Sequence, residues 1–315
     1  METRIVKGDA IKDKIFNDVK KEIGMLKTKH YGTPGIAFIG FSSIPLSTYT
    51  IPYHVHLAED AGFNVLTEIK TDDTSEVELF ELIERLNHTD DIHAIVLFQP
   101  LPPHLNPIRM INKIIPEKEV EGFHPQHMLT TLMPDIKPSL YPMCLPTALM
   151  ELFSEANVKL EKDQEWVFVL DDEFITNSLT NMVVKSAASK VVPPDCVVTY
   201  INKNSSHLKS YCKKADILVV VSKYPEYIQN DWLKQGVCII DVYSNLVKEI
   251  PSKNNPAQLI PIIRGGVNVD SATSIAATII PIPGGLMTVV LPILFRNALQ
   301  AFKNKCGVGK FNSVF

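Results

Sequence analysis

The run Pro281-Ile-Pro-Gly-Gly-Leu-Met-Thr288 contains the residues best suited to hold a ligand through backbone atoms. Proline removes backbone donors, and paired glycines allow positive φ and close approach of the backbone to a bound molecule, so this run is neither a helix nor a central strand. The following segment, Met287 to Lys303, has a wide apolar face and is predicted to be a helix. Exposed amides beside a helix N-terminus suit a planar polar ligand. The alternative is a tight loop before a core helix, with no ligand.

Three further motifs precede this loop in a fixed order: Pro100-Leu-Pro102 after an apolar strand, Glu117-Lys-Glu-Val-Glu-Gly-Phe-His-Pro125, and Val237-Cys-Ile-Ile-Asp-Val242. Together the motifs resemble the bifunctional methylenetetrahydrofolate dehydrogenase/methenyltetrahydrofolate cyclohydrolase family, from about Ile5 to about Phe302. The resemblance implies one-carbon metabolism, with a tetrahydrofolate derivative as substrate and NAD or NADP as cofactor. The family's reaction joins hydride transfer from a methylene carbon to a nicotinamide with hydrolysis of the resulting methenyl bridge.

The hydrolysis step needs a cationic or proton-carrying group beside the bridge carbon. The family uses a lysine on a helix. An ungapped count back from Gly62, the family's helix-ending glycine, places His54 at the lysine position and Thr50 at a tyrosine position. A register shift of one or three residues would supply a phenol from Tyr49 or Tyr53.

The second catalytic position lies at the end of an apolar strand, where the family has Val-Gln-Leu-Pro-Leu-Pro. Here the segment reads Leu97-Phe-Gln-Pro-Leu-Pro102, so Phe98 replaces the glutamine that pairs with the lysine. Because side chains alternate along a strand, Gln99 is expected to point the other way. His54 and Phe98 are therefore the predicted catalytic positions, and both are substituted.

The resemblance implies substrate-binding roles for Thr50, Glu121, Pro283, Gly284 and Gly285. Glu121 replaces an aspartate that accepts hydrogen bonds from the pteridine ring, and adds one methylene; the alternative is a solvated loop acid. The loop also lacks a Gly-Pro pair between Leu286 and Met287. That shortening is expected to move its amides by several ångströms, since a chain spans ~3.3 Å per residue.

The nucleotide-binding segment departs most from the family, whose first strand of the second domain ends in Gly-Arg-Ser-x-x-Val-Gly-x-Pro. The matching positions are Asp171, Asp172, Glu173, Asn177 and, near the expected nicotinamide, Tyr243 in place of a glycine. Carboxylates thus stand where a pyrophosphate would approach, and a like-charge pair costs about 1 kcal/mol at ~4 Å in water. A cation such as Lys203 could compensate, although no pattern indicates it.

Two functions of different classes follow. One is an active bifunctional NAD(P)-dependent dehydrogenase/cyclohydrolase that uses His54 in place of lysine, because imidazole titrates near neutral pH. The other is a pseudoenzyme that binds a folate or a protein partner without turnover, with His54 as a packing residue. The combined changes at the lysine, glutamine and dinucleotide positions favour impaired or lost activity.

The periodicity predicts an α/β protein. Helices are expected over 8–26, 47–61, 76–86, 107–114, 145–156 and 177–188, and strands over 35–40, 64–67, 94–98, 166–170, 197–200, 217–221 and 238–242. Continuous apolar strands indicate parallel sheets covered on both faces, and the second half is expected to be Rossmann-like. The predicted domains are 1–143 with 284–315 for folate and catalysis, and 144–283 for NAD(P). The resemblance implies that the last helix returns to the first domain, that the site is the cleft between the domains, and that the protein is a homodimer.

Composition limits the other possibilities. The chain has 315 residues, 45% of them hydrophobic and 21% charged, with a net charge of -4, so no basic excess attracts nucleic acid. No apolar run approaches the ~18 residues of a membrane span. The five cysteines are dispersed without metal-like spacing, which indicates free thiols in a reducing compartment. A cytoplasmic location is expected, and the alternative is the mitochondrial matrix after removal of a leader.

Overall fold

The computed structural model describes residues 2–44, 47–132, 140–171, 192–193, 195–253 and 259–308, and the side chains of 130–132 are left out. The chain divides into two compact units. The small-sheet unit contains residues 12–144 and 291–315, and the large-sheet unit contains residues 1–11 and 145–290.

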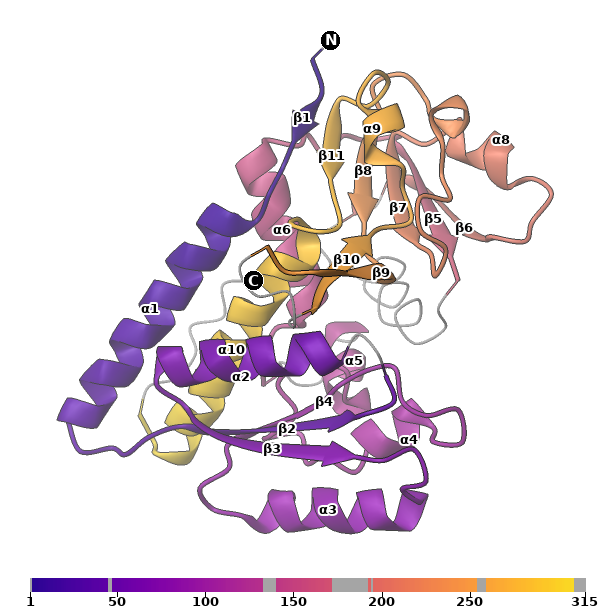
Figure 1. Cartoon of the computed structure of the whole chain (residues 1–315). Coiled ribbons are helices and arrows are strands. Elements are labelled where there is room, and N and C mark those ends of the chain that lie inside the picture. The colour runs from indigo at the N-terminus through magenta and orange to yellow at the C-terminus, as the bar shows by residue number, and fades with distance from the viewer. Residues whose placement is uncertain are drawn as a thin grey trace. The chain divides into compact units, whose positions relative to one another are not determined.

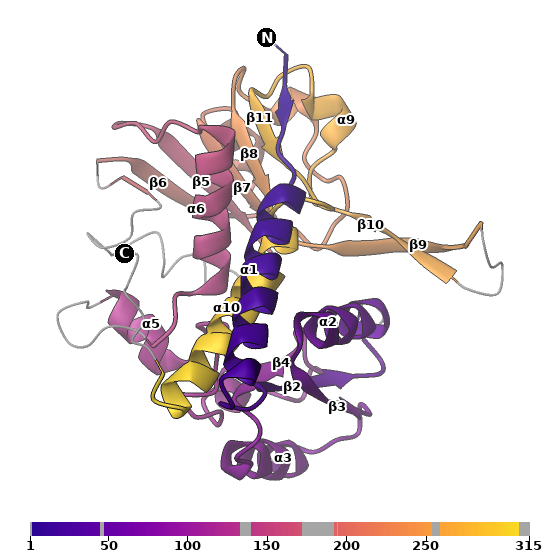
Figure 2. The same cartoon turned by 90° about the vertical axis from the view of Figure 1, so that its left-hand side faces the viewer.

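The small-sheet unit is built on the parallel strands β3 (Asn64–Lys70), β2 (Gly35–Phe41) and β4 (Ala94–Leu97), in that order. The central strand β2 is buried along its whole length. Helices α2 (Ser47–Ala61) and α3 (Glu76–His88) cover opposite faces of this sheet (Figures 1 and 2). The unit also contains α4 (Pro107–Ile111), α5 (Pro125–Leu132) and most of α1 (Asp9–Thr28).

Local sequence signals explain where these helices lie. The four-residue spacing of the apolar positions in α1 places them on one face of the helix, and all four are buried: Ile11, Ile15, Val19 and Ile23. Helix α3 begins with a capping box, in which the Ser75 hydroxyl accepts from the Glu78 amide and the Glu78 carboxylate accepts from the Ser75 amide. Periodic apolar residues with a defined cap therefore gave correct helix predictions.

Buried charged groups fix the loop after β4. The Lys118 ammonium donates to the carbonyls of Leu86 and Thr89 at 2.8 Å each and so closes the C-terminus of α3. The Glu119 carboxylate is 2% exposed and accepts hydrogen bonds from the amides of Glu121, Gly122 and His124. Gly122 has φ of +92°, and a Cβ there would lie 2.7 Å from the Cα of Met143, so only glycine fits.

The C-terminal helix α10 (Leu286–Lys305) places its residues from Leu291 onward in the small-sheet unit, as predicted for the returning helix. Asn297, which is fully buried, joins this helix to the loop around α5. Its Nδ2 donates to the carbonyl of Val120 at 2.8 Å and to that of Pro142 at 2.9 Å. One side chain thus satisfies two buried carbonyls of a segment far away in sequence.

The large-sheet unit contains a parallel sheet in the order β1 (Arg4–Ile5), β11 (Thr278–Ile280), β8 (Cys238–Asp241), β7 (Ile217–Val221), β5 (Glu165–Leu170) and β6 (Val197–Asn202). Trp166 of β5 contacts Phe153 of α6 (Cys144–Ala156), with ring centroids 6.0 Å apart. Alternate residues of the same strand, Val167 and Val169, join a core with α8 (Leu208–Cys212) and α9 (Val269–Ala272). Helices cover both faces, so the predicted doubly wound, Rossmann-like domain is confirmed.

Several elements were not predicted. Strands β9 (Asn245–Pro251) and β10 (Leu259–Arg264) form an antiparallel hairpin that extends away from the sheet of its unit (Figure 2). Its register shifts between Ile262 and Ile263, which breaks the alternation that would mark a strand in sequence. The short elements β1, β11, α5 and the 3-10 helix at Asn230–Trp232 also carry little periodic signal. The predicted helix over 177–188 lies outside the described residues.

We expect Asn297→Ala to lower the free energy of unfolding by about 2 kcal/mol or more, because two buried carbonyls lose their donor and a cavity remains. Urea denaturation monitored by circular dichroism measures this loss. The control is Asn17→Ala, at an exposed position of α1 in the same unit, with an expected change within about 0.5 kcal/mol. Equal effects of the two substitutions would show that the hydrogen bonds of Asn297 do not stabilise the unit.

Candidate functional site

His54 lies in the middle of α2, where the alignment with the family places the catalytic lysine. Its Nδ1 is 2.6 Å from the carbonyl oxygen of Thr50, one helical turn earlier. A carbonyl oxygen only accepts hydrogen bonds, so Nδ1 carries the proton and the lone pair belongs to Nε2. The predicted tyrosine-position residue Thr50 therefore sets the tautomer of His54 through its backbone.

Aromatic rings surround the imidazole. The ring centroid of Phe98 is 4.9 Å away, that of Tyr53 is 6.1 Å away, and that of Phe38 is 6.2 Å away, each in an edge-on geometry. Burial among these rings lowers the pKa of His54 from 6.5 to about 4, although the Thr50 carbonyl opposes the shift. His54 is therefore neutral at physiological pH. The structure brings the two predicted catalytic positions, His54 and Phe98, into contact.

Gln99 follows Phe98 and does not restore the polar partner. Its peptide bond to Pro100 is cis, and its Nε2 lies 3.4 Å from the carbonyl oxygen of Leu97. Its Oε1 is buried without a hydrogen-bond partner among the described residues. Phe98, and not Gln99, contacts His54, in agreement with the strand alternation.

Glu121, the predicted pteridine contact, is half-buried in the loop held by Glu119. Burial, with a smaller contribution from the Glu119 carboxylate, raises the pKa of Glu121 from 4.5 to about 8. Glu121 is therefore largely protonated at neutral pH and can donate as well as accept a hydrogen bond. Glu121 therefore does not provide the permanent negative charge that an aspartate would provide at this position.

The Pro-Gly-Gly loop belongs to the large-sheet unit, and several of its polar groups bond within that unit. The Ile282–Pro283 peptide bond is cis, and Gly284 has φ of +99°. The carbonyl of Gly284 accepts from the amide of Gly8 at 2.7 Å, and the amide of Gly285 donates to the carbonyl of Pro281 at 2.8 Å. Helix α10 begins directly afterwards, at Leu286, so the loop and helix expected here are confirmed. The substrate-binding roles of Pro283, Gly284 and Gly285 stay a prediction.

Of the predicted nucleotide-binding residues, Asp171 is described and Asp172, Glu173 and Asn177 lie outside the described residues. Asp171 directly follows β5. Its Oδ1 is 3.5 Å from the Nζ of Lys203, and its Oδ2 accepts from the amide of Lys223 at 3.0 Å. The negative charge of Asp171 is thus compensated inside the protein.

The carboxyl group at the end of β8 holds the segment around Gly266. The Asp241 carboxyl accepts hydrogen bonds from the amides of Gly266 and Val267 at 3.0 and 2.9 Å, and burial raises its pKa to about 7. A Cβ at Gly266 would lie 2.8 Å from the Cβ of Ser222. Tyr243 follows this strand and is half-buried. The glycine at 266 is therefore required by its neighbours.

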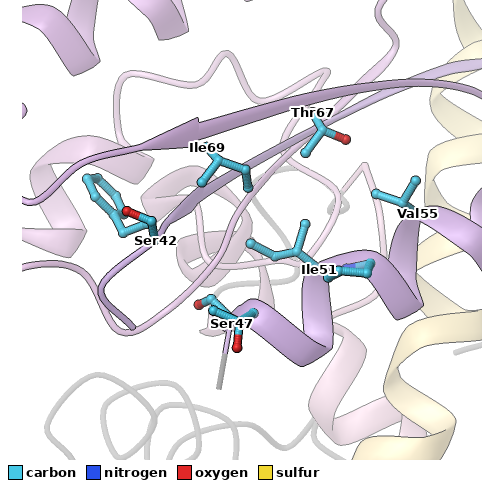
Figure 3. A pocket seen from close by; sticks show the side chains of 9 residues that line it. Ser42, Ser47, Ile51, Val55, Thr67 and Ile69 are labelled. Carbon is cyan, nitrogen blue, oxygen red and sulfur yellow. The ribbon is translucent and has the colours of Figure 1, made fainter. Parts of the chain in front are cut away.

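A separate pocket of about 370 Å³ lies on the other flank of α2 (Figure 3). Ile51 and Val55 of α2 face Thr67 and Ile69 of β3 across it. Phe98, by contrast, follows β4 on the opposite edge of the sheet. The pocket lining contains none of the predicted site residues.

Two family models cover most of the chain. The tetrahydrofolate dehydrogenase/cyclohydrolase catalytic domain matches residues 6–121, and the NAD(P)-binding domain of the same proteins matches residues 143–306. The chain belongs to the tetrahydrofolate dehydrogenase/cyclohydrolase family. It is therefore a member of a folate-linked one-carbon family, as the sequence motifs predicted.

Full-length relatives support this membership. The bifunctional protein FolD of Desulfosudis oleivorans is 31% identical over 98% of this chain and 100% of its own length. That of Desulfatibacillum aliphaticivorans is 30% identical over 96% and 98%. The crystal structure of the Trypanosoma brucei methylenetetrahydrofolate dehydrogenase-cyclohydrolase, complexed with NADP and an inhibitor, shares the fold with a TM-score of 0.79 at 23% identity, covering 96% of this chain and 98% of that one.

The family implies an NAD(P) cofactor, but the described strand ends of the large-sheet unit do not fit one. Asp171 and Lys203, after β5 and β6, are paired with each other, and Tyr224 covers Lys203. The Lys203 ammonium is therefore already engaged inside the protein. Sequence reasoning named Lys203 only as a compensating cation without a supporting pattern, and it missed Tyr224. The signal that could have found both is their position just after apolar strands.

Two further classes of site find no support in the described part of the chain. No group of three or more His, Cys, Asp or Glu side chains there is arranged to hold a metal ion. Among the described helices, none combines the length and the apolar character that a membrane span requires.

The low pKa of His54 links stability to pH. The imidazole of His54 binds a proton near pH 6.5 in the unfolded state and near pH 4 in the folded state. The neutral imidazole therefore stabilises the folded state fully above pH 6.5, and this stabilisation is lost as the pH falls toward 4. From pH 7 to pH 5, we expect the free energy of unfolding of the wild type to fall by about 1–2 kcal/mol more than that of His54→Gln. This range is reduced from the full pKa difference because the ring is only half-buried. Urea denaturation at both pH values measures it.

The control is His88→Gln, an exposed position on α3, which should keep the wild-type pH dependence. An unchanged pH dependence in His54→Gln would contradict the assignment of a buried, neutral imidazole.

Proposed function

We propose that this protein binds a tetrahydrofolate derivative and has lost, or retains only weakly, the dehydrogenase and cyclohydrolase turnover of its family. The observation that carries the proposal is the neutral His54 held against Phe98, at the positions of the family's lysine and glutamine. Family membership supports the folate ligand.

The charge state of His54 explains the expected loss. With a pKa of about 4, about one imidazole in a thousand is protonated at pH 7. A lysine in this place would carry a permanent charge and three donors, and a glutamine at position 98 would accept one of them. Phe98 offers no acceptor, so neither the cation nor its partner is present. General acid–base catalysis contributes typically about 10²–10⁴-fold, which is the scale of the expected loss.

A specific observation favours a second candidate, an active enzyme that uses His54 as a neutral base. The hydrogen bond from Nδ1 to Thr50 leaves the Nε2 lone pair as an acceptor, which is the form a general base needs. Such a base would accept a proton from water and would not act as a cation. The two candidates therefore differ in whether removal of the imidazole changes the rate.

We expect the wild type to bind a folate analogue in calorimetry, and to hydrolyse methenyltetrahydrofolate at or near the uncatalysed rate. The double variant His54→Lys/Phe98→Gln, which restores both partners, should raise that rate at least tenfold. His54→Ala should leave the wild-type rate unchanged. Loss of methenyl absorbance, corrected for the buffer reaction, gives the rates.

Tyr53→Phe is the matched control, because it alters an exposed ring beside His54 without supplying a cation. A substantial wild-type rate that falls in His54→Ala would establish the active-enzyme candidate. Absence of folate binding in the wild type would overturn the proposal for both candidates.

We also propose that the protein is a homodimer formed through the hairpin of β9 and β10. Val247, Ile250, Leu259 and Ile260 on this hairpin are each between 38% and 46% exposed. Ile250 and Ile260 are directly paired across the two strands, so they present one apolar face. An exposed cluster of this kind is typical of an interaction surface.

Ile250→Lys/Ile260→Lys should convert a dimer to a monomer, because two charges would be buried in the interface. Size-exclusion chromatography with light scattering measures the mass. Val197→Lys, at an exposed apolar position of β6 in the same unit, should leave the mass unchanged. A monomeric wild type, or a dimer that survives the double substitution, would contradict this interface.

A further inference from the structure

Lys203 contacts both Asp171 and Tyr224, and the three residues follow neighbouring strands of the large-sheet unit. Asp171 directly follows β5, Lys203 directly follows β6, and Tyr224 lies three residues after β7. We call Asp171, Lys203 and Tyr224 the rim clasp. Strands β6 and β7 lie on opposite sides of β5, so the order of the strands reverses at β5. In doubly wound sheets, ligands bind outside the carboxyl ends of the strands at this switch point.

The contacts within the rim clasp are close and partly shielded. Lys203 Nζ is 3.5 Å from Asp171 Oδ1 and 3.2 Å from the centroid of the Tyr224 ring. The side chains of Lys203 and Asp171 are only 13% and 11% exposed. The amide of Lys223 donates to Asp171 Oδ2, which fixes the carboxylate from the β7 side. The ammonium is thus held between a carboxylate and an aromatic face.

The position of Lys203 has a defined meaning in a dinucleotide-binding sheet. The end of the second strand meets the adenosine ribose, where an acid accepts from the 2′-hydroxyl and a cation receives a 2′-phosphate. β5 and β6 are the first and second strands of this sheet in chain order after β1. Lys203 has the charge that suits a 2′-phosphate, but Asp171 neutralises that charge and Tyr224 covers it.

We propose that the rim clasp is an internal block that excludes adenine dinucleotides from the large-sheet unit, and that Asp171 is its specificity-determining residue. Asp171 withholds the Lys203 ammonium from a phosphate, and Tyr224 occupies the space above it. A dinucleotide must break both contacts before it can settle on the strand ends. Release of Lys203 alone creates a site that prefers ligands with a ribose 2′-phosphate. This inference concerns the nucleotide and does not depend on the loss of catalysis at His54.

Calorimetry with adenosine 2′,5′-bisphosphate and adenosine 5′-monophosphate tests the block directly, because these fragments lack the pyrophosphate and the nicotinamide. The wild type should show no saturation with either one at millimolar concentration. Asp171→Asn keeps an acceptor for the Lys223 amide and removes the charge. It should bind the bisphosphate at least tenfold more tightly than the wild type, with a smaller gain for the monophosphate.

Two further variants assign the gain to the clasp. Asp171→Asn/Lys203→Met should lose the gain, and Tyr224→Ala alone should show a gain of its own, since the ring is 50% exposed and its removal leaves the core intact. The control is Asp231→Asn, which breaks the exposed Lys209–Asp231 pair of the same unit and should bind neither fragment.

The block is overturned if the wild type binds the bisphosphate saturably and Lys203→Met abolishes that binding, because Lys203 would then already be available. It is equally overturned if neither Asp171→Asn nor Tyr224→Ala gains affinity. The readout uses no folate and no turnover, so its failure is distinguishable from failure of the proposed loss of activity.

Discussion

Buried carboxylates that satisfy loop amides are the constraint on which both units depend. Parallel strands are covered on both faces, so the loops at their ends begin partly buried from solvent. Each backbone amide buried there needs a hydrogen-bond acceptor in the protein. Glu119 supplies this acceptor to the amides of its own loop, after the β4 edge of the small sheet. Asp241, at the end of β8, supplies it to Gly266 and Val267. Asp171, after β5, supplies it to Lys223.

The same burial from solvent determines the protonation states of the candidate site residues. A group that is not paired changes its protonation state when it is buried, and it does so in the direction that removes charge. His54 becomes neutral by losing a proton, and Glu121 becomes neutral by keeping one. The reaction that the resemblance implies needs a cationic or proton-carrying group at the first position, and the family supplies it as a charged lysine. The structure around α2 therefore disfavours the charge state that the reaction uses.

The sequence was sufficient for the elements with strong periodicity and defined ends. The four-residue spacing of apolar side chains in α1 and the continuous apolar run of β7 predicted the correct element types. The hairpin of β9 and β10 was missed because its bulge and its exposed apolar residues leave no clean alternation. Contact between His54 and Phe98 followed from the family alignment, but the low pKa of His54 did not, because it depends on rings from three segments. Pairing of Lys203 with Asp171 depends on β5 and β6 being neighbours, which local patterns do not specify.

The charged residues of the Glu117–Pro125 motif have roles in the fold that do not depend on catalysis. Lys118 and Glu119 lie in the Glu117–Pro125 motif, and their charged groups bind backbone atoms: the ammonium accounts for two carbonyls at the end of α3, and the carboxylate accepts from loop amides. These roles continue to be needed when no substrate is turned over. His54 and Phe98 make only packing contacts and one local hydrogen bond among the described residues, so nothing in that part of the fold requires the family's lysine and glutamine there. A lysine beside Phe98 would be a buried cation without its glutamine partner, and a glutamine beside a neutral imidazole would gain little. The two positions are therefore coupled, and the loss of either partner removes the physical reason to keep the other.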